Sequence, residues 1–457
     1  MSGIEGGADA AQPLPETAAP VPLASRGVQV LIWRMIASAG ALAANVLISR
    51  GLGPQGRGAY SLYTTTAITL MALGKLGLDQ ANVYFRTTRG ISTERLLAAN
   101  STIAFAVGSL CVAVMAFLPK LLPSLFGDTS PALLVLAGLI VPLTIHTQFV
   151  ASLQMMDGRV LTQFTAAAAG AFAQAMAMLV LGLLHAITLP AVLGVVTAAT
   201  AVTWIVTVGG PGVRAIFSRW DWPLLREALS HALVLHLGFC FFFLQIRLDV
   251  FMLKGLADLA TVGHYSIALT LAETMQLATD SVAIALVPRQ IGNSLSESAT
   301  VALRGARMNF LVGLCLAAGW AIAGYPLIVL FFGPQFAPAF GPLVALLPGL
   351  LLLGMQRVCS VAVLRSGNTW LISGIYGTAL VAKLLLNFWL IPWWGAIGAG
   401  IASSLTYVLS AVLFLVWTVR LAQVPAHTML PQRADIALFA SALWGLVRHL
   451  GKSAPKA

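Results

Sequence analysis

Charged side chains are scarce in this 457-residue chain: 9% of the residues are charged, whereas 59% are hydrophobic. A soluble domain carries roughly a quarter charged residues. A chain so poor in charge cannot cover a water-facing surface, which excludes a soluble globular protein. Its mean hydropathy is +0.90, and apolar runs of about 20 residues, enough to cross the hydrocarbon core, recur along it. Because these runs are continuous and not alternating, they predict transmembrane helices and exclude a barrel.

Cysteine is also rare, and enzyme motifs are missing. The four cysteines lie inside apolar segments, without the spacing of a metal site, so we expect small interior residues and neither disulfides nor metal ligands. The sequence has no Walker loop, GxSxG or HExxH motif. We therefore expect no enzyme, no cofactor and no ATP hydrolysis by this chain. The cysteines are Cys111, Cys240, Cys315 and Cys359.

The net charge of +11 is spread along the chain. Basic residues stand singly or in small groups between apolar runs, with no continuous basic stripe, so nucleic acid is not an expected partner. Most of them fall in alternate connections, and the positive-inside rule then places both termini in the cytoplasm. The connections predicted to lie outside hold only Arg50, Arg57, Lys120 and Lys254.

The apolar runs predict an all-α polytopic membrane protein with about twelve spans. We expect a disordered cytoplasmic tail over 1–27, an N-terminal lobe of spans 1–6 over 28–222, a C-terminal lobe of spans 7–12 over 223–419, and a cytoplasmic tail over 420–457. Within the last tail, Asp435 to Lys452 is short and basic at its end, which favours an interfacial helix. The spans are 28–49, 58–85, 96–118, 131–153, 161–184, 189–210, 229–253, 263–288, 308–332, 338–362, 369–391 and 395–419.

A short sequence occurs once in each half. Arg50-Gly51-Leu52 corresponds to Lys254-Gly255-Leu256, and Gly58-Ala59-Tyr60-Ser61 corresponds to Gly263-His264-Tyr265-Ser266. Each copy joins the first and second spans of its half. Six spans separate the copies, an even number, so the halves are predicted to be parallel repeats related by a pseudo-two-fold axis along the membrane normal.

Four cations within the spans are candidate substrate ligands: Arg34, Lys75, Arg247 and Lys383. A charge at the bilayer centre costs about 2.5–3.5 kcal/mol, so it usually faces a wet cavity or a partner. We predict that these four line one aqueous chamber between the lobes. Such a chamber suits an anion such as a pyrophosphate, which arginine grips with two parallel hydrogen bonds. For Arg247, a structural role near the outer end of span 7 is the alternative.

Four carboxylates within the spans are candidate ion-coupling residues: Asp79, Asp249, Glu273 and Asp280. Glu273 and Asp280 are seven residues apart and share a helix face. Burial raises the pKa of a carboxylate, so these groups can take up a coupling proton, or bind Na⁺ instead. The alternative for Asp249 is again structural.

Other polar residues in the spans have simpler explanations. Lys75 and Asp79 are four residues apart, and an ion pair within one helix is an alternative to substrate binding. Arg357 lies near the inner end of span 10, where we expect its side chain to reach the membrane interface. For His146 we expect an interior histidine with satisfied hydrogen bonds.

Several segments resemble bacterial polysaccharide flippases. ISRGLGPQGRGAYSLY (Ile48–Tyr63) followed by GKLGLDQANVYF (Gly74–Phe85) is similar to the pattern with which that family often begins. RLDVFMLKGLADLATVGHYSIA (Arg247–Ala268) is similar to its seventh span, and NFWLIPWWGAIGAGIASSLTY (Asn387–Tyr407) to the junction of its spans 11 and 12. The chain departs from the pattern at Arg57, where an aromatic residue is common.

The resemblance is to the O-antigen-type (Wzx-like) flippases of the multidrug/oligosaccharidyl-lipid/polysaccharide exporter superfamily. It implies two six-helix lobes in a V around a central cavity, in the bacterial inner membrane. It implies that undecaprenyl-pyrophosphate-linked glycan is moved across that membrane by alternating access, for O-antigen, capsule or exopolysaccharide synthesis. Membrane lipids, a polysaccharide polymerase and glycosyltransferases are the other implied partners.

Three alternatives remain open from the residues. A multidrug or toxin extrusion antiporter of the same superfamily would carry organic cations and favour acidic groups in its N-lobe, where this chain offers Arg34 and Lys75 against Asp79. A lipid II flippase commonly has two more spans than this chain offers. A membrane glycan polymerase or ligase generally needs a large external loop, whereas the longest one here, over 119–130, has only about a dozen residues.

Overall fold

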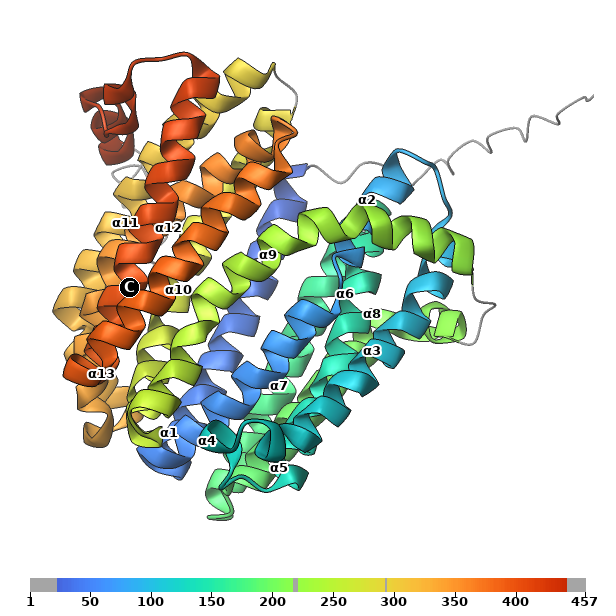
Figure 1. Ribbon diagram of the computed structural model, residues 1–457, viewed down its shortest axis with the longest axis vertical. Coiled ribbons are helices and arrows are strands. Elements are labelled where there is room, and N and C mark those ends of the chain that lie inside the picture. Colours follow the sequence, from blue (N-terminus) through green and yellow to red (C-terminus); the bar gives the residue numbers. More distant parts are fainter. Residues whose placement is uncertain (1–22, 217–220, 292–293, 442–457) are drawn as a thin grey trace, which may run out of the picture.

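The structure is a computed structural model that describes residues 23–216, 221–291 and 294–441. Its regular elements in these ranges are all helical, and they form two bundles that lie side by side (Figure 1). Most of the tail predicted over 1–27 lies outside the described residues. The first helix already begins at Leu23.

The first bundle, which we call the N-lobe, contains the elements from α1 to α8. Helix α1 packs on α7, α3 packs on α6, and α7 packs on α8. The elements are α1 (Leu23–Gly74), α2 (Leu78–Thr87), α3 (Thr93–Leu121), α4 (Pro123–Phe126), α5 (Pro131–Gly138), α6 (Ile140–Met156), α7 (Val160–Leu183) and α8 (Leu189–Ile216).

The second bundle, which we call the C-lobe, follows from α9 onward. Helix α13 packs on both α9 and α12, and α11 packs on α12. The elements are α9 (Trp222–Leu256), α10 (Leu259–Ile291), α11 (Leu295–Phe332), η1 (Pro334–Ala339), α12 (Phe340–Arg365), α13 (Thr369–Ala422) and η2 (Ala426–Met429).

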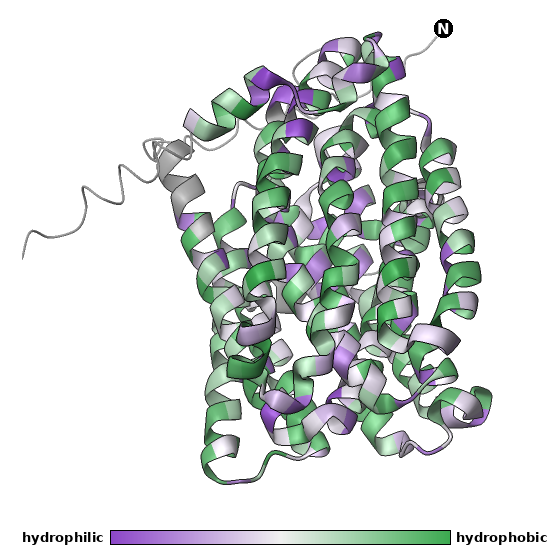
Figure 2. Cartoon of the chain, turned by 90° about the vertical axis from the view of Figure 1, so that its left-hand side faces the viewer, coloured by the Kyte–Doolittle hydropathy of each residue, from purple (hydrophilic) through white to green (hydrophobic). Residues whose placement is uncertain are grey.

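The predicted spans are present. In the described part of the chain, nine helices are long and apolar enough to cross a membrane. Two of them, Ile32–Thr87 and Thr369–Ala422, each hold two predicted spans. Helix α10 holds the remaining span and carries a charged face. Figure 2 shows hydrophobic residues along the length of the outer helices, with hydrophilic residues gathered at the upper ends and between the helices. The prediction of a multi-pass helical membrane protein in two lobes is confirmed.

The connections between spans are tighter than predicted. Helical geometry in α1 is interrupted only at Gly53 (φ 66°, ψ −178°), and in α13 only at Gly395 (φ 51°, ψ −127°). A positive φ is readily adopted only by glycine, so each glycine allows one span to turn into the next within a residue. The connection predicted over 50–57 is therefore present but is confined to the turn at Gly53. Arg57 lies in helix and not in a loop.

The second span breaks where it was predicted to be continuous. The chain leaves helical geometry at Leu76 (φ 52°) and Gly77 (φ 73°), and α2 begins at Leu78. His236 of α9 donates from Nε2 to the carbonyl of Leu73 at 3.0 Å, which satisfies one of the carbonyls that the break exposes. A Cβ at Gly77 would lie 3.0 Å from the carbonyl oxygen of Ala232, so glycine also permits the close approach of α9.

Both ends of the bundles can be followed in Figure 1. The first turns of α1 and the last turns of α13 lie at the upper end, and the turn inside α1 lies at the lower end, near α4 and α5. We call the upper end inner and the lower end outer, following the orientation predicted from the basic residues.

The chain after α13 folds back onto the C-lobe at the inner end. Residues 433–441 are helical, and Asp435 forms a buried ion pair with Arg307 of α11, with Oδ2 and Nε 2.6 Å apart. Arg307 also donates to the carbonyl of Thr428 at 2.6 Å. The interfacial position predicted for Asp435 to Lys452 stays a prediction, and its part beyond 441 lies outside the described residues.

Candidate functional site

One face of α10 carries polar side chains along its length and lies against α1 of the other lobe. The residues are spaced so that they share a face of a helix. We call this boundary, with the side chains that reach it from α9 and α12, the α1–α10 seam. The polar residues of α10 on it are Ser266, Thr270, Glu273, Asp280 and Ser281.

Arg57 of α1 crosses the outer part of the seam. Its Nε donates to Ser266 Oγ at 3.0 Å and its Nη2 to Thr270 Oγ1 at 3.2 Å, while Nη1 donates to Asn45 Oδ1 of its own lobe at 2.7 Å. The guanidinium also lies 5.2 Å from the ring centroid of Tyr60. Arg57 is only 4% exposed. The hydrogen-bond acceptors around this buried cation are neutral.

Glu273 and Arg247 occupy the middle of the seam. Arg247 Nη2 of α9 lies 2.9 Å from Glu273 Oε1. Glu273 is also close enough to Arg57 for their charges to attract. Its side chain is 50% exposed although it lies near the middle of α10. A half-exposed carboxylate at that depth is too costly in hydrocarbon, so this part of the seam is suited to water.

Arg34, Asp280 and Arg357 lie in the inner part of the seam. Arg357 Nη1 of α12 forms an ion pair of 2.9 Å with Asp280 Oδ2, and Arg34 Nη1 donates to Ser281 Oγ at 3.5 Å. The charge of Arg34 also attracts that of Asp280. The prediction that Arg357 reaches the membrane interface is therefore wrong: a carboxylate on the next helix offers its guanidinium a partner inside the bundle.

Taken together, the seam carries an excess of positive charge. Its charged side chains are four arginines and two carboxylates, so its net charge is +2. Only Arg57 among them is buried; besides the half-exposed Glu273, Arg247 is 24% exposed, Asp280 19% and Arg357 32%, and Arg34 is partly exposed. The arrangement can attract an anion between the lobes.

Lys75 and Asp79 pair with each other at the break between α1 and α2. Their Nζ and Oδ2 atoms are 2.7 Å apart, and Lys75 Nζ lies 4.0 Å from the ring centroid of Phe239 of α9. The alternative of an ion pair between these two residues is thus confirmed in geometry. The substrate-binding role of Lys75 and the ion-coupling role of Asp79 stay predictions.

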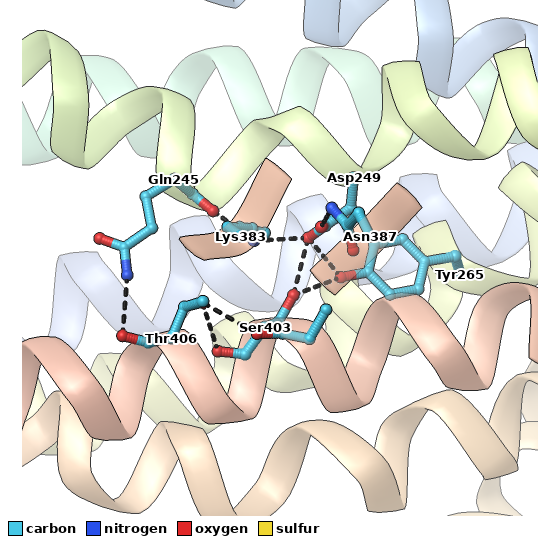
Figure 3. Close-up of polar contacts among 8 residues, drawn as sticks. Gln245, Asp249, Tyr265, Lys383, Asn387, Ser403 and Thr406 are labelled. Carbon is cyan, nitrogen blue, oxygen red and sulfur yellow. Dashed lines mark hydrogen bonds and ion pairs between the residues drawn. The ribbon is translucent and has the colours of Figure 1, made fainter. Parts of the chain in front are cut away.

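Lys383 and Asp249 lie inside the C-lobe, among side chains of α9, α10 and α13 (Figure 3). Both side chains are 0% exposed, and Lys383 Nζ is 2.8 Å from Asp249 Oδ2. Lys383 also donates to the backbone carbonyl of Gln245, and its Nζ lies 5.1 Å from the ring centroid of Tyr407. In this conformation no surface of Lys383 is open to a substrate. Its role as a substrate ligand stays a prediction.

Further hydrogen bonds hold the carboxylate of Asp249 in place. Asn387 Nδ2 donates to Oδ1 at 2.8 Å, and the hydroxyls of Tyr265 and Ser403 donate to Oδ2 at 2.7 Å and 2.8 Å (Figure 3). These partners come from α10 and from both sides of the turn at Gly395 in α13, so the network joins α10 and both halves of α13 to α9. Asp249 is completely buried and bonded to partners on neighbouring helices, which is the environment expected of a residue that stabilises the fold. Its ion-coupling role stays a prediction.

The four cations predicted to line one chamber do not lie together in the structure. Arg34 and Arg247 share the α1–α10 seam, whereas Lys75 lies at the break before α2 and Lys383 inside the C-lobe. Three of the four form ion pairs with carboxylates that we predicted as ion-coupling residues. The reason is electrostatic: a charge taken out of water is stabilised most by an opposite charge in contact.

Sequence reasoning missed Arg57 as a residue between the lobes. It was placed in an outer connection because the segment around it is rich in glycine and polar residues. The departure from the flippase pattern could have indicated it. An arginine at a position where an aromatic residue is common needs hydrogen-bond acceptors, and a neighbouring helix can supply them.

The prediction that His146 is an interior histidine with satisfied hydrogen bonds is confirmed. Trp204 Nε1 donates to its Nδ1 at 2.9 Å, so the ring proton lies on Nε2, which is 2.8 Å from Ser101 Oγ. The hydroxyl of Ser101 donates in turn to the carbonyl of Leu97 at 2.7 Å. A neutral ring satisfies each of these contacts.

All four cysteines are free. Cys111 and Cys359 are buried as predicted, whereas Cys240 is only partly buried and Cys315 is exposed, so the prediction of an interior position is wrong for Cys315.

A small cavity opens at the inner half of the molecule, between α2, α9, α12 and α13. It has a volume of about 200 Å³ and is lined mainly by aromatic and aliphatic side chains with a few hydroxyls. Phe239, which Lys75 contacts, and Phe242, whose ring lies 6.0 Å from the guanidinium of Arg357, both line it. Apolar walls with cations at the rim suit an amphiphile with an acidic group.

Comparison with known proteins rests on structure alone, because no family model and no curated protein matches the chain. The structure of lipid II flippase MurJ in an inward closed conformation matches with a TM-score of 0.69 at 12% identity, covering 92% of this chain and 99% of that one. An inward-facing multidrug resistance MATE transporter matches with a TM-score of 0.62 at 15% identity, covering 87% and 98%.

A third matching structure is described by the polarity of its binding pocket. It is a MOP superfamily transporter from Pyrococcus furiosus, described by the reverse polarity of its binding pocket, with a TM-score of 0.64 at 15% identity over 87% of this chain and 94% of that one. Transporters of both lipid-linked and multidrug type thus share the architecture seen here. The chain has the two-lobed, twelve-helix fold of the MOP superfamily of membrane transporters.

Proposed function

We propose that the protein is a flippase that moves a polyprenyl-pyrophosphate-linked oligosaccharide across the bacterial inner membrane by alternating access, for surface polysaccharide synthesis. The observation that carries the proposal is the α1–α10 seam. It places four arginines and two carboxylates between the lobes, and Glu273 is half exposed at mid-depth. Water and an excess of positive charge at that depth suit an anionic headgroup.

The chemistry of the seam favours a pyrophosphate over a neutral or cationic cargo. Guanidinium groups present paired N–H donors that match phosphate oxygens. Arg34 makes only a long contact with Ser281, at 3.5 Å, so its donors are available to a ligand. The sugars of the cargo would occupy the wet part of the gap, and the prenyl chain would stay in the bilayer.

The cavity between α2, α9, α12 and α13 supports the same proposal. Its apolar walls would accept the first part of a lipid chain next to the pyrophosphate, with Lys75 and Arg357 at its rim. It opens in the inner half of the molecule, from which a cytoplasmic substrate would enter. The direction from cytoplasm to periplasm, and a cytoplasmic position for both termini, belong to the proposal.

The second candidate is a multidrug antiporter, which the MATE-type match favours. A transporter of organic cations needs an excess of negative charge where its cargo binds, and the seam has the opposite sign. A glycan polymerase or ligase has no support from the three matched structures described above, which are of a flippase and two transporters.

The test is transport by purified protein in proteoliposomes. Fluorescent polyprenyl-pyrophosphate oligosaccharide is placed in both leaflets, and a membrane-impermeant quencher reports how much reaches the outer one. We expect translocation by the natural protein and loss with Arg34→Ala. Arg226→Ala, which removes an exposed arginine of α9 outside the seam, is the matched control and should transport normally. Translocation of an organic cation in place of the lipid-linked glycan would refute the proposal.

A further inference from the structure

The two lobes touch backbone to backbone at the outer end of the seam. A Cβ added to Gly58 of α1 would lie 1.8 Å from the carbonyl oxygen of Leu259, and one added to Gly263 of α10 would lie 2.0 Å from that of Pro54. No side chain fits at either distance. These two helices from opposite lobes therefore cross with nothing but glycine between their backbones.

The two glycines are equivalent positions of the internal repeat. Gly58 opens the sequence GAYS in the first half, and Gly263 opens GHYS in the second. Each lies directly against the other copy, since the Cβ of Gly58 would be 3.1 Å from the backbone nitrogen of Gly263. The two copies of the repeat thus contact each other at the boundary between the lobes. For this reason each copy needs glycine, which has no side chain, at this position.

Arg57 precedes this crossing and joins the lobes beside it. Two of its three hydrogen bonds reach Ser266 and Thr270 on α10, three and seven residues after Gly263 on the same helix. The third, to Asn45, ties the guanidinium to its own lobe. The side chain of Arg57 is thus hydrogen-bonded to both the N-lobe and the C-lobe, close to the point where the two backbones are in contact.

A second arginine from the same segment also crosses to the C-lobe. Arg50 Nε donates to the carbonyl of Phe331 at 2.7 Å, and Nη2 donates to that of Leu330. These carbonyls belong to the last turn of α11, which has no helical partners for them. A cation there is also favoured by the dipole of the helix. Arg50 is exposed and Arg57 is buried. The contact of Arg50 therefore lies at the edge of the interface between the lobes, and that of Arg57 lies inside it.

We propose that Arg57 is a latch that holds the two lobes together at the outer end through Ser266 and Thr270, across the contact of Gly58 with Gly263. It is a positioning residue, because it acts on the distance between the lobes whatever cargo they carry. The proposal does not depend on the lipid-linked substrate.

The chemistry of the latch makes it reversible. An ion pair of Arg57 with a carboxylate would add the attraction of two opposite charges in contact, which opening would have to overcome. Arg57 instead bonds neutral hydroxyls, which lose little on exposure, and its own charge gains hydration when the lobes part. Closure is therefore stabilised by several hydrogen bonds and by backbone contact, while opening is favoured by the solvation of the guanidinium.

The test measures the distance between the lobes at the outer end. All four native cysteines are replaced, and spin labels are placed on Lys120→Cys of the N-lobe and Gln335→Cys of the C-lobe, which are both exposed. Electron–electron distance distributions are then recorded for the full chain in nanodiscs without substrate. We expect one short population for the parent protein and a shift of most molecules to longer distances with Arg57→Ala.

Partner variants separate a latch from a general loss of structure. Ser266→Ala with Thr270→Val keeps the arginine and should reproduce the shift, and adding Arg57→Ala should extend it no further. Arg57→Lys, which keeps the charge but cannot reach three acceptors at once, should give an intermediate distribution. Lys254→Ala removes another cation at the outer end and should leave the distance unchanged.

A folded Arg57→Ala protein with the parental distance distribution would overturn the proposal, as would an equal shift with Lys254→Ala. Folding is checked by thermal melting of each labelled variant. If Arg57→Ala does not fold, the partner variants decide, because they keep Arg57 in place. A parental distribution in the Ser266→Ala, Thr270→Val protein would then refute the latch.

Discussion

Lys383 of α13 and Asp249 of α9 form an ion pair of 2.8 Å with both side chains completely buried in the C-lobe. A pair so deeply buried is stabilised by contact and by added hydrogen bonds, and removing one member leaves an unpaired charge that costs about 3–5 kcal/mol. The pair therefore constrains how α9 and α13 pack, and its removal should act on folding before it acts on transport.

We predict that Lys383→Met or Asp249→Asn alone lowers the melting temperature of the purified protein strongly, and that the double variant recovers much of the loss. The physical reason is that neither charge is then left without its partner. Thermal melting in detergent for the four proteins of the cycle measures the coupling. Additive losses in the double variant would contradict a direct interaction between the two side chains.

Arg34→Ala is expected to abolish transport without lowering the melting temperature by more than a few degrees. Its guanidinium makes only a long hydrogen bond across the seam, so little stability depends on it. Ser281→Ala, which removes that contact and keeps the charge, should transport nearly as well as the parent. Equal loss of transport in both variants would point to the contact between the lobes and not to the charge.

Asp435→Asn is expected to release residues 424–441 from the C-lobe. The buried contact of Asp435 with Arg307 is the charged attachment of that segment to α11, and losing one partner of a buried pair is costly. Hydrogen exchange should show faster exchange in this segment alone. Asp128→Asn, a change at an exposed position of the outer end, is the matched control and should leave exchange unaltered.

His146→Phe is expected to lower stability by about 1–3 kcal/mol because Trp204 Nε1, which is partly buried, loses its acceptor. The pH dependence of transport should not change, since the neutral ring already satisfies its neighbours. A changed pH profile in a protein that still transports would show that His146 takes part in proton movement.

The spans, the two lobes and the internal repeat could be predicted from the sequence because they depend on the length and period of apolar runs. A turn within 50–57 was expected, but not its confinement to Gly53, and the break at Leu76 was not predicted at all. That break depends on contact with another helix, because α9 reaches the carbonyl of Leu73 through His236.

The candidate site was only partly predictable, for a different reason. Sequence position showed which charges lie within the membrane, and Arg34, Arg247, Glu273 and Asp280 do meet the seam. It could not show which charge faces which. Lys383 is paired within its own lobe, whereas Arg57, assigned to a loop, lies between the lobes, because partner choice depends on contacts between helices far apart in sequence.

The central claim is that the positively charged seam between α1 and α10 selects an anionic lipid headgroup, and binding tests it most directly. Purified protein in nanodiscs is titrated with a polyprenyl pyrophosphate and, separately, with the matching uncharged polyprenol. We expect the pyrophosphate to bind at least tenfold more tightly, and Arg34→Ala to remove most of that preference. Equal affinity for the two lipids, or an undiminished preference in Arg34→Ala, would contradict the account.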